Sequence, residues 1–120
     1  MDKLKEYAAQ MGIIIEENRL PLFKSFMEEV TEVNKVMNLT AITKTHDFLV
    51  KHYLDSLSLL SLPYFEKGVK LIDVGCGAGF PGVPLFFARP DIKLTLLDSL
   101  NKRVNFLKNT MDKLKIDNVV

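Results

Sequence analysis

Helical periodicity runs through the first 62 residues. The apolar positions of a first helix are Leu4, Tyr7, Ala8 and Met11. A second helix is predicted from Pro21, in its first turn, to about Val36, with the stripe Leu22, Phe23, Phe26, Met27, Val30, Val33 and Met37. A third follows Thr45, a candidate N-cap, and stops at Pro63; one side carries Phe48, Leu49, His52, Tyr53, Ser56, Leu59 and Leu60. We interpret the Phe and Met stripe as core or domain interface rather than a platform for stacking bases.

The period changes at Lys70. A short strand over Lys70–Val74, a short helix over Val83–Ala88 and a second strand over Lys93–Leu97 are predicted. Ser99 is the candidate N-cap of a further helix, whose apolar residues are Val104, Leu107, Met111 and Leu114. After Asp117-Asn118, Val119-Val120 resemble the start of a third strand. This alternation predicts an α/β fold with a parallel sheet and right-handed crossovers, preceded by a helical region over 1–62.

A parallel sheet needs helices on both faces and more than two strands. We therefore interpret the chain as a fragment, or as one half of a longer enzyme. Its exposed strand edges are expected to make it marginally stable or prone to associate. Composition is ordinary, at 48% hydrophobic and 26% charged residues. No apolar run is long enough for a membrane span, and the charged start is not a signal peptide. The single cysteine, Cys76, fits a reducing cytoplasm.

The net charge of +1 does not indicate a nucleic-acid partner by itself. Residues 1–33 carry 4 basic and 7 acidic groups, a net charge of −3, whereas residues 61–120 carry 9 basic and 6 acidic groups, a net charge of +3. A mixed, solvated surface explains this modest asymmetry.

Glycines at Gly75, Gly77, Gly79 and Gly82 follow an apolar strand that contains Asp73. Glycine lets a backbone turn sharply and approach a ligand closely, so a nucleotide-type pocket is predicted. Asp98 ends the second strand and has the two oxygens needed to accept hydrogen bonds from both ribose hydroxyls. The dinucleotide spacing G-x-G-x-x-G fails when counted from Gly75, and the shifted match from Gly77 contains a proline.

The run Asp-Val-Gly-Cys-Gly-Ala-Gly resembles motif I of class I S-adenosylmethionine-dependent methyltransferases. With the segments 38–42, 49–57, 73–85 and 97–107, it resembles the glucose-inhibited division protein B family, the bacterial small-subunit ribosomal RNA guanine-N7 methyltransferases. The resemblance covers most of residues 34–120, and Gly-Phe-Pro-Gly-Val-Pro and Asp-Ser-Leu-Asn-Lys-Arg are its specific motifs. It implies that residues 63–120 form the first half of a Rossmann-like, S-adenosylmethionine-binding class I sheet, with the remainder absent.

The resemblance also implies a cofactor, a partner and site residues. The cofactor is S-adenosylmethionine, and the partner is 16S ribosomal RNA in the small subunit or its precursor. The cofactor-binding residues are Asp73, at the methionine end; Gly75, Gly77 and Gly79, in the loop; Phe80, against the cofactor; and Asp98, on the ribose. Guanine N7 has an in-plane lone pair, so we predict no general base, only alignment and exclusion of water. The chain alone is expected to be inactive; a non-catalytic binding module and a dinucleotide-dependent oxidoreductase are the alternatives.

Four further polar residues keep two interpretations each. His52 and Asp55 share a helical face, either as a pair that reaches the glycine loop or as a surface pair or satisfied core histidine. Asn38 and Thr40 either form a turn and cap, or contact the loop or substrate.

Three residues in the second half of the chain also have roles to be assigned. Lys102 and Arg103 are either surface charges or contacts to RNA phosphates. Cys76 is expected to be a small loop residue, not a nucleophile, and no metal site is expected. The target nucleotide and the oligomeric state stay open.

Overall fold

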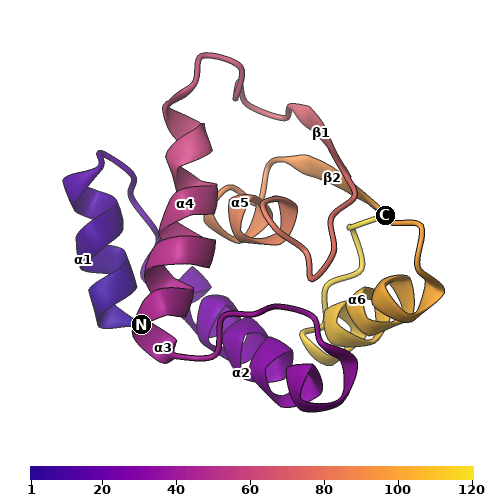
Figure 1. The fold of residues 1–120 in the computed structure, drawn as a ribbon. Coiled ribbons are helices and arrows are strands. Elements are labelled where there is room, and N and C mark those ends of the chain that lie inside the picture. Colours follow the sequence, from indigo (N-terminus) through magenta and orange to yellow (C-terminus); the bar gives the residue numbers. More distant parts are fainter.

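A computed structural model describes residues 1–120. Its elements, in chain order, are α1 (Asp2–Gln10), η1 (Glu17–Arg19), α2 (Leu20–Met37), α3 (Thr45–Asp47), η2 (Phe48–Leu54), α4 (Asp55–Leu57), η3 (Ser58–Ser61), β1 (Lys70–Val74), α5 (Gly82–Ala88), β2 (Lys93–Leu97) and α6 (Asn101–Lys113). Figure 1 shows the two strands at one side of the molecule, with α5 beside them and α1, α2 and α4 toward the other side. None of the helices combines the length and the apolar character needed to cross a bilayer.

The sheet is parallel, as the sequence predicts. β1 pairs with β2 from Lys70 opposite Lys93 to Val74 opposite Leu97. Val120 then donates its N–H to the Leu94 carbonyl at 3.1 Å and accepts the Leu96 N–H at 2.7 Å. In a parallel ladder, a residue donates its N–H to one residue of the neighbouring strand and accepts the N–H of the residue two positions further along. Val120 therefore extends the hydrogen-bonded ladder beside β2, and the predicted α/β fold class with a parallel sheet is confirmed.

The two faces of the sheet differ sharply. Every residue of α5 is buried, and the side chains of Leu94 and Leu96 lie beside Gly82 at its start. On the other face, Ile72 is 59% exposed and Val74 is 77% exposed. Buried parallel sheets carry cover on both faces, so this face is an uncovered apolar surface.

One hydrophobic core joins the helical region to the sheet. Its cluster of 23 buried residues extends from Leu4 to Met111 and includes residues of α1, α2, η2, α5, β2 and α6. Phe23 meets Tyr53 and Phe87 edge-to-face at 5.0 and 5.4 Å, and the Tyr53 hydroxyl donates to the Phe23 carbonyl. Arg19 Nε donates to the Phe87 carbonyl at 2.7 Å, at the carboxyl end of α5. The first helices therefore pack as part of the sheet's own core.

Three local predictions are wrong. Lys44, not Thr45, is the N-cap of α3, and no side chain caps that helix. Leu100, not Ser99, is the N-cap of α6, and no side chain caps that helix; the Leu100 N–H donates to Asp98 Oδ1 at 2.9 Å in an Asx turn. The first 62 residues are also not helical throughout, because residues 13–16 form an irregular segment that buries alternate isoleucines.

Candidate functional site

The glycine loop, residues 75–82, leaves the carboxyl end of β1 and turns into α5. The N–H groups of Gly75 and Cys76 both donate to the Leu97 carbonyl, at 2.8 and 3.0 Å. The loop therefore begins across the end of β2, at the edge where open parallel sheets bind ligands. Its φ angles at Gly75, Gly77 and Gly79 are 72°, 57° and 109°, a region that favours glycine.

The glycines divide into two kinds. A Cβ atom on Gly75 or Gly77 would meet nothing within 4 Å. A Cβ atom on Gly79 would lie 2.9 Å from Val83 Cγ2 and 3.2 Å from Phe26 Cζ. Gly82 is equally crowded, by Leu96, Asp73 and Leu94. The first two glycines thus border open space, whereas the last two permit close packing, a division that glycine spacing alone does not reveal.

Asp98 is joined to this loop. Its Oδ2 accepts the Gly77 N–H at 2.9 Å, its Oδ1 accepts the Leu100 N–H, and Arg103 Nη1 lies 3.6 Å from Oδ2. The side chain is 3% exposed, and the hydrogen bonds from Leu100 and then Gly77 lower its pKa. The Asp98 side chain therefore lies beside the glycines and fixes the loop by a hydrogen bond. The sequence reasoning missed this role. The part predicted for it on a ribose stays a prediction.

Asp73 lies beneath the loop. Its Oδ2 accepts the Gly82 N–H at 2.9 Å, and the residue is 9% exposed. Burial raises its pKa, and the Gly82 bond opposes that rise. Burial, followed by the charges of Asp73 and Asp98, raises the pKa of the buried Cys76 thiol to about 11. A thiol that stays protonated is a poor nucleophile, so Cys76 is a packing residue of the loop.

Phe80 and His52 meet at the far end of the loop. Their ring centroids are 4.1 Å apart and their planes differ by 6°. His52 Nε2 lies 2.8 Å from Thr40 Oγ1, so both residues belong to the surroundings of the loop. Asn38 instead ends α2 in the left-handed conformation, with φ of 52°, which is the turn role. Burial lowers the pKa of His52, and nearby Asp55 opposes this.

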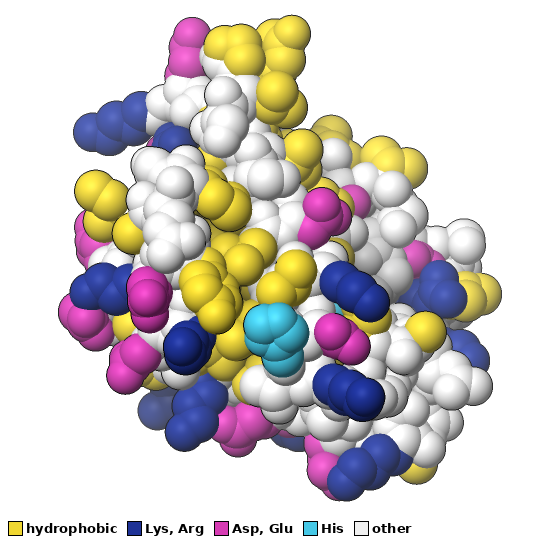
Figure 2. Space-filling model, turned by 60° about the vertical axis from the view of Figure 1, so that its left-hand side comes forward, with side chains coloured by type: hydrophobic (Ala, Val, Ile, Leu, Met, Phe, Trp, Pro, Cys, Tyr) yellow, Lys and Arg dark blue, Asp and Glu magenta, His cyan; other side chains and the backbone are white.

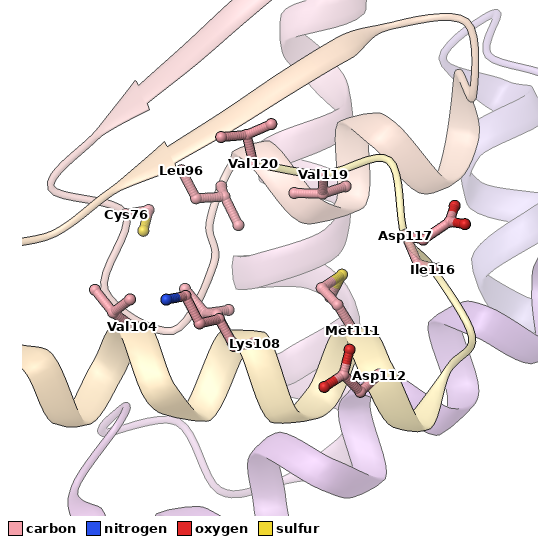
Figure 3. A pocket seen from close by; sticks show the side chains of 11 residues that line it. Cys76, Leu96, Val104, Lys108, Met111, Asp112, Ile116, Asp117, Val119 and Val120 are labelled. Carbon is pink, nitrogen blue, oxygen red and sulfur yellow. The ribbon is translucent and has the colours of Figure 1, made fainter.

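Two hollows flank the loop. A cavity of about 380 Å³ separates β2 from α6, and Figure 3 shows side chains from both elements pointing into it. Its lining is mainly apolar: Cys76, Leu96, Val104, Leu107, Lys108, Met111, Asp112, Ile116, Asp117, Val119 and Val120. A separate cleft of about 290 Å³ is lined by residues that include His52, Asp55, Phe80 and Pro81. No three His, Cys, Asp or Glu side chains come together as metal ligands would.

Charges on the face drawn in Figure 2 are mixed, with basic and acidic side chains interspersed around a band of apolar ones. No patch of a single sign dominates that view. At the start of α6, Arg103 serves as the partner of Asp98, while Lys102 is exposed.

Comparison with known proteins identifies the family. The family model described as GidB, rRNA small subunit methyltransferase G, matches residues 19–120, a range that contains the glycine loop, Asp98 and His52. The chain belongs to the rRNA small subunit methyltransferase G family. The resemblance predicted from the motifs is thereby confirmed.

Its relatives carry the same name. The ribosomal RNA small subunit methyltransferase G of Alkaliphilus metalliredigens is 46% identical over 116 residues, 97% of this chain and 48% of the relative. That of Oenococcus oeni is 48% identical over 106 residues, 88% and 44% of the two chains. That of Clostridium perfringens (strain SM101) is 40% identical over 118 residues, 98% and 49%. The chain spans about half the length of the curated relatives it matches.

Proposed function

We propose that the protein of family length is an S-adenosylmethionine-dependent methyltransferase acting on N7 of a guanine in 16S ribosomal RNA, and that this chain supplies one wall of its cofactor site. The hydrogen bond from the Gly77 N–H to the Asp98 carboxylate carries the proposal. It joins the two sequence motifs at the carboxyl ends of β1 and β2, within a chain of the rRNA methyltransferase family. We further propose that the enzyme works in the cytoplasm, on the small subunit or its precursor.

The residues present fit such a cofactor. The open space beside Gly75 and Gly77 lets a ligand approach the backbone, which any side chain there would obstruct. The Asp73 carboxylate is buried, accepts one backbone hydrogen bond and forms no ion pair, so the ammonium group at a methionine end would compensate its charge. A carboxylate has about four lone-pair sites, so Asp98 keeps acceptor capacity for a hydroxyl beyond its two backbone bonds.

The chemistry asks for alignment rather than proton transfer. S-adenosylmethionine, when bound, supplies a methyl group on a sulfonium centre, and a guanine N7 attacks it through its own lone pair. The residues of this chain therefore bind, orient and exclude water, with Asp73 and Asp98 fixing the two ends of the site. We assign no general base. We infer the RNA partner from the family, and Lys102, an exposed cation in the segment that follows Asp98, is available for a phosphate.

The test joins this chain to the part of the Alkaliphilus metalliredigens relative that it does not cover. This protein is expected to bind S-adenosylhomocysteine in isothermal titration, and to transfer labelled methyl from S-adenosylmethionine to small subunits that lack the modification. Digestion and mass spectrometry should find 7-methylguanine. Gly77→Val is expected to abolish binding, whereas Gly12→Val, the same change at a positive-φ glycine with open space elsewhere, is the matched control and should bind normally.

Each other result has a meaning. Tighter binding of NAD than of S-adenosylhomocysteine would make the protein a dinucleotide enzyme. Binding without methyl transfer would leave a non-catalytic binding module. Unchanged affinity in Gly77→Val and Asp98→Ala would mean that the site is elsewhere.

A further inference from the structure

The ring of Phe80 is enclosed by four other rings. His52 covers one face at 4.1 Å, nearly parallel, while Phe48 and Phe26 meet it edge-on at 5.7 and 5.8 Å and Tyr53 is tilted at 6.2 Å. Edge-to-face contacts are the usual aromatic arrangement, so the stacked imidazole is the distinct member of the set. Phe80 follows Gly79 directly, so what fixes this ring also fixes the second half of the glycine loop.

A π-helical turn places three of these rings. η2 is π-helical over Phe48–Leu54, a rare form that is frequent at functional sites. At about 100° per residue, an α-helix would turn Tyr53 about 140° away from Phe48. The wider π turn brings Phe48, His52 and Tyr53 to one side, where all three contact Phe80. The irregular turn is therefore the feature that surrounds the loop's aromatic ring.

The imidazole is itself anchored from a third segment. Thr40 Oγ1 lies 2.8 Å from His52 Nε2 and accepts the Ile42 N–H at 3.1 Å. The Thr40 N–H donates to Asn34 Oδ1 at 2.8 Å, on α2. A continuous set of contacts thus runs from α2 through Thr40 and His52 to Phe80.

We infer that His52 is a positioning residue, which holds Phe80 and thereby fixes residues 79–82 of the glycine loop before a ligand binds. Order established in advance reduces the entropy lost on binding. The consequence for the cofactor rests on the function proposed above. His52 is not sealed in the core, because it borders the cleft it shares with Asp55 and Lys51. A side chain there is replaceable without opening a cavity in the main cluster.

The first experiment measures amide hydrogen exchange in this chain. The N–H groups of Gly79 and Phe80 donate to the Cys76 carbonyl at 2.8 and 3.1 Å, so their protection reports the order of the loop. His52→Ala is expected to speed their exchange about tenfold relative to amides of β2. His52→Phe, which keeps a ring on Phe80, should restore most of the protection. His46→Ala, an exposed histidine of the same helical segment, should change neither.

A purely structural role predicts something else. It would lower the urea midpoint of His52→Ala and reduce the amide protection of Gly79 and Phe80 by the same factor as that of β2. This result would overturn the inference. Thr40→Val, which removes the anchor and keeps both rings, is expected to give an intermediate rise in exchange. If Thr40→Val and His52→Ala both leave the two amides unchanged, the inference is equally wrong.

The second experiment titrates S-adenosylhomocysteine into the joined protein of family length described above, as parent and with the same substitutions, while recording the amide shifts of the glycine loop. His52→Ala is expected to bind about tenfold more weakly than the parent chain, and His52→Phe within about twofold. If the parent shows no shift in loop amides, the proposed function fails, and the exchange experiment still decides the part played by His52. If the parent binds and His52→Ala binds equally well, the function stands and the inference falls.

Discussion

Gly77 and Gly79 look equivalent in the sequence, yet alanine should have very different effects at the two positions. Both have positive φ, 57° at Gly77 and 109° at Gly79. Only Gly79 has neighbours for the new methyl group, with Val83 Cγ2 at 2.9 Å and Leu107 Cδ2 at 3.0 Å. These carbon–carbon distances are shorter than van der Waals contact allows. The two side chains belong to different helices, α5 and α6, so both would have to move to make room for the methyl group.

The magnitudes follow from these two terms. For Gly77→Ala, the left-handed conformation costs about 1–2 kcal/mol and the stiffer unfolded chain returns about 0.4–1 kcal/mol, which leaves a net loss near 1 kcal/mol. For Gly79→Ala, backbone strain of about 1–3 kcal/mol and overpacking of about 1–3 kcal/mol add, giving a net loss of about 2–5 kcal/mol. The difference contains the cost of packing together with the difference in backbone strain.

Urea unfolding followed by far-UV circular dichroism measures both free energies, and equal m values confirm that the compared states match. Gly12→Ala, with φ of 79° and open space around it, controls for backbone strain outside the loop. We expect the Gly12 and Gly77 variants to agree within about 0.5 kcal/mol and the Gly79 variant to be clearly less stable. Equal losses at Gly77 and Gly79 would refute the division of the glycines.

Three further predictions concern the surroundings of the loop. Asp98→Asn should cost about 1–2 kcal/mol at neutral pH through the weakened backbone bonds. Because the folded pKa of Asp98 is lowered, its contribution is present above the ordinary carboxyl range and is lost as pH falls, so urea midpoints of parent and variant should converge in acid; a constant gap would contradict this. Asp73→Asn should show the opposite sign. Because the folded pKa of Asp73 is raised, its ionisation destabilises the fold as pH rises, so the free energy of unfolding of the variant should increase relative to that of the parent from acid to neutral pH. The variant should also bind S-adenosylhomocysteine less well. Val104→Leu should fill part of the cavity beside α6 and add about 0.5–1 kcal/mol, measured by the urea midpoint, whereas Val36→Leu, at an exposed site, should add nothing.

The elements that the sequence predicts well are those set by local pattern. The stripe from Leu22 to Met37 gives α2 almost to the residue, and the change of period at Lys70 gives the parallel strands. Glycine spacing and the place of Asp98 indicate a nucleotide-type pocket, and the longer motifs Gly-Phe-Pro-Gly-Val-Pro and Asp-Ser-Leu-Asn-Lys-Arg carry the resemblance to the family, which the family model confirms.

The errors arise where distant segments decide the outcome. Whether a glycine faces open space or Phe26 depends on how α2 lies on the loop, and no local pattern encodes that. The π turn at Phe48–Leu54 brings its rings against Phe80, which lies beyond β1 in the chain, so a local pattern does not contain the contact. The helix begins one residue later than the Ser99 cap predicts: Asp98 accepts the Leu100 N–H, and Leu100 becomes the N-cap.

The helices before the sheet explain why the glycine loop is ordered in this chain although one face of the sheet is uncovered. Phe26 of α2 packs beside Gly79, and His52 stacks on Phe80, so both contacts come from residues that precede β1. Arg19 adds a hydrogen bond to the end of α5, the helix that the loop begins. All three act on the covered face, whereas the exposed side chains of Ile72 and Val74 lie on the other. The shape of the loop therefore depends on the helical region more than on whatever covers the far face of the sheet.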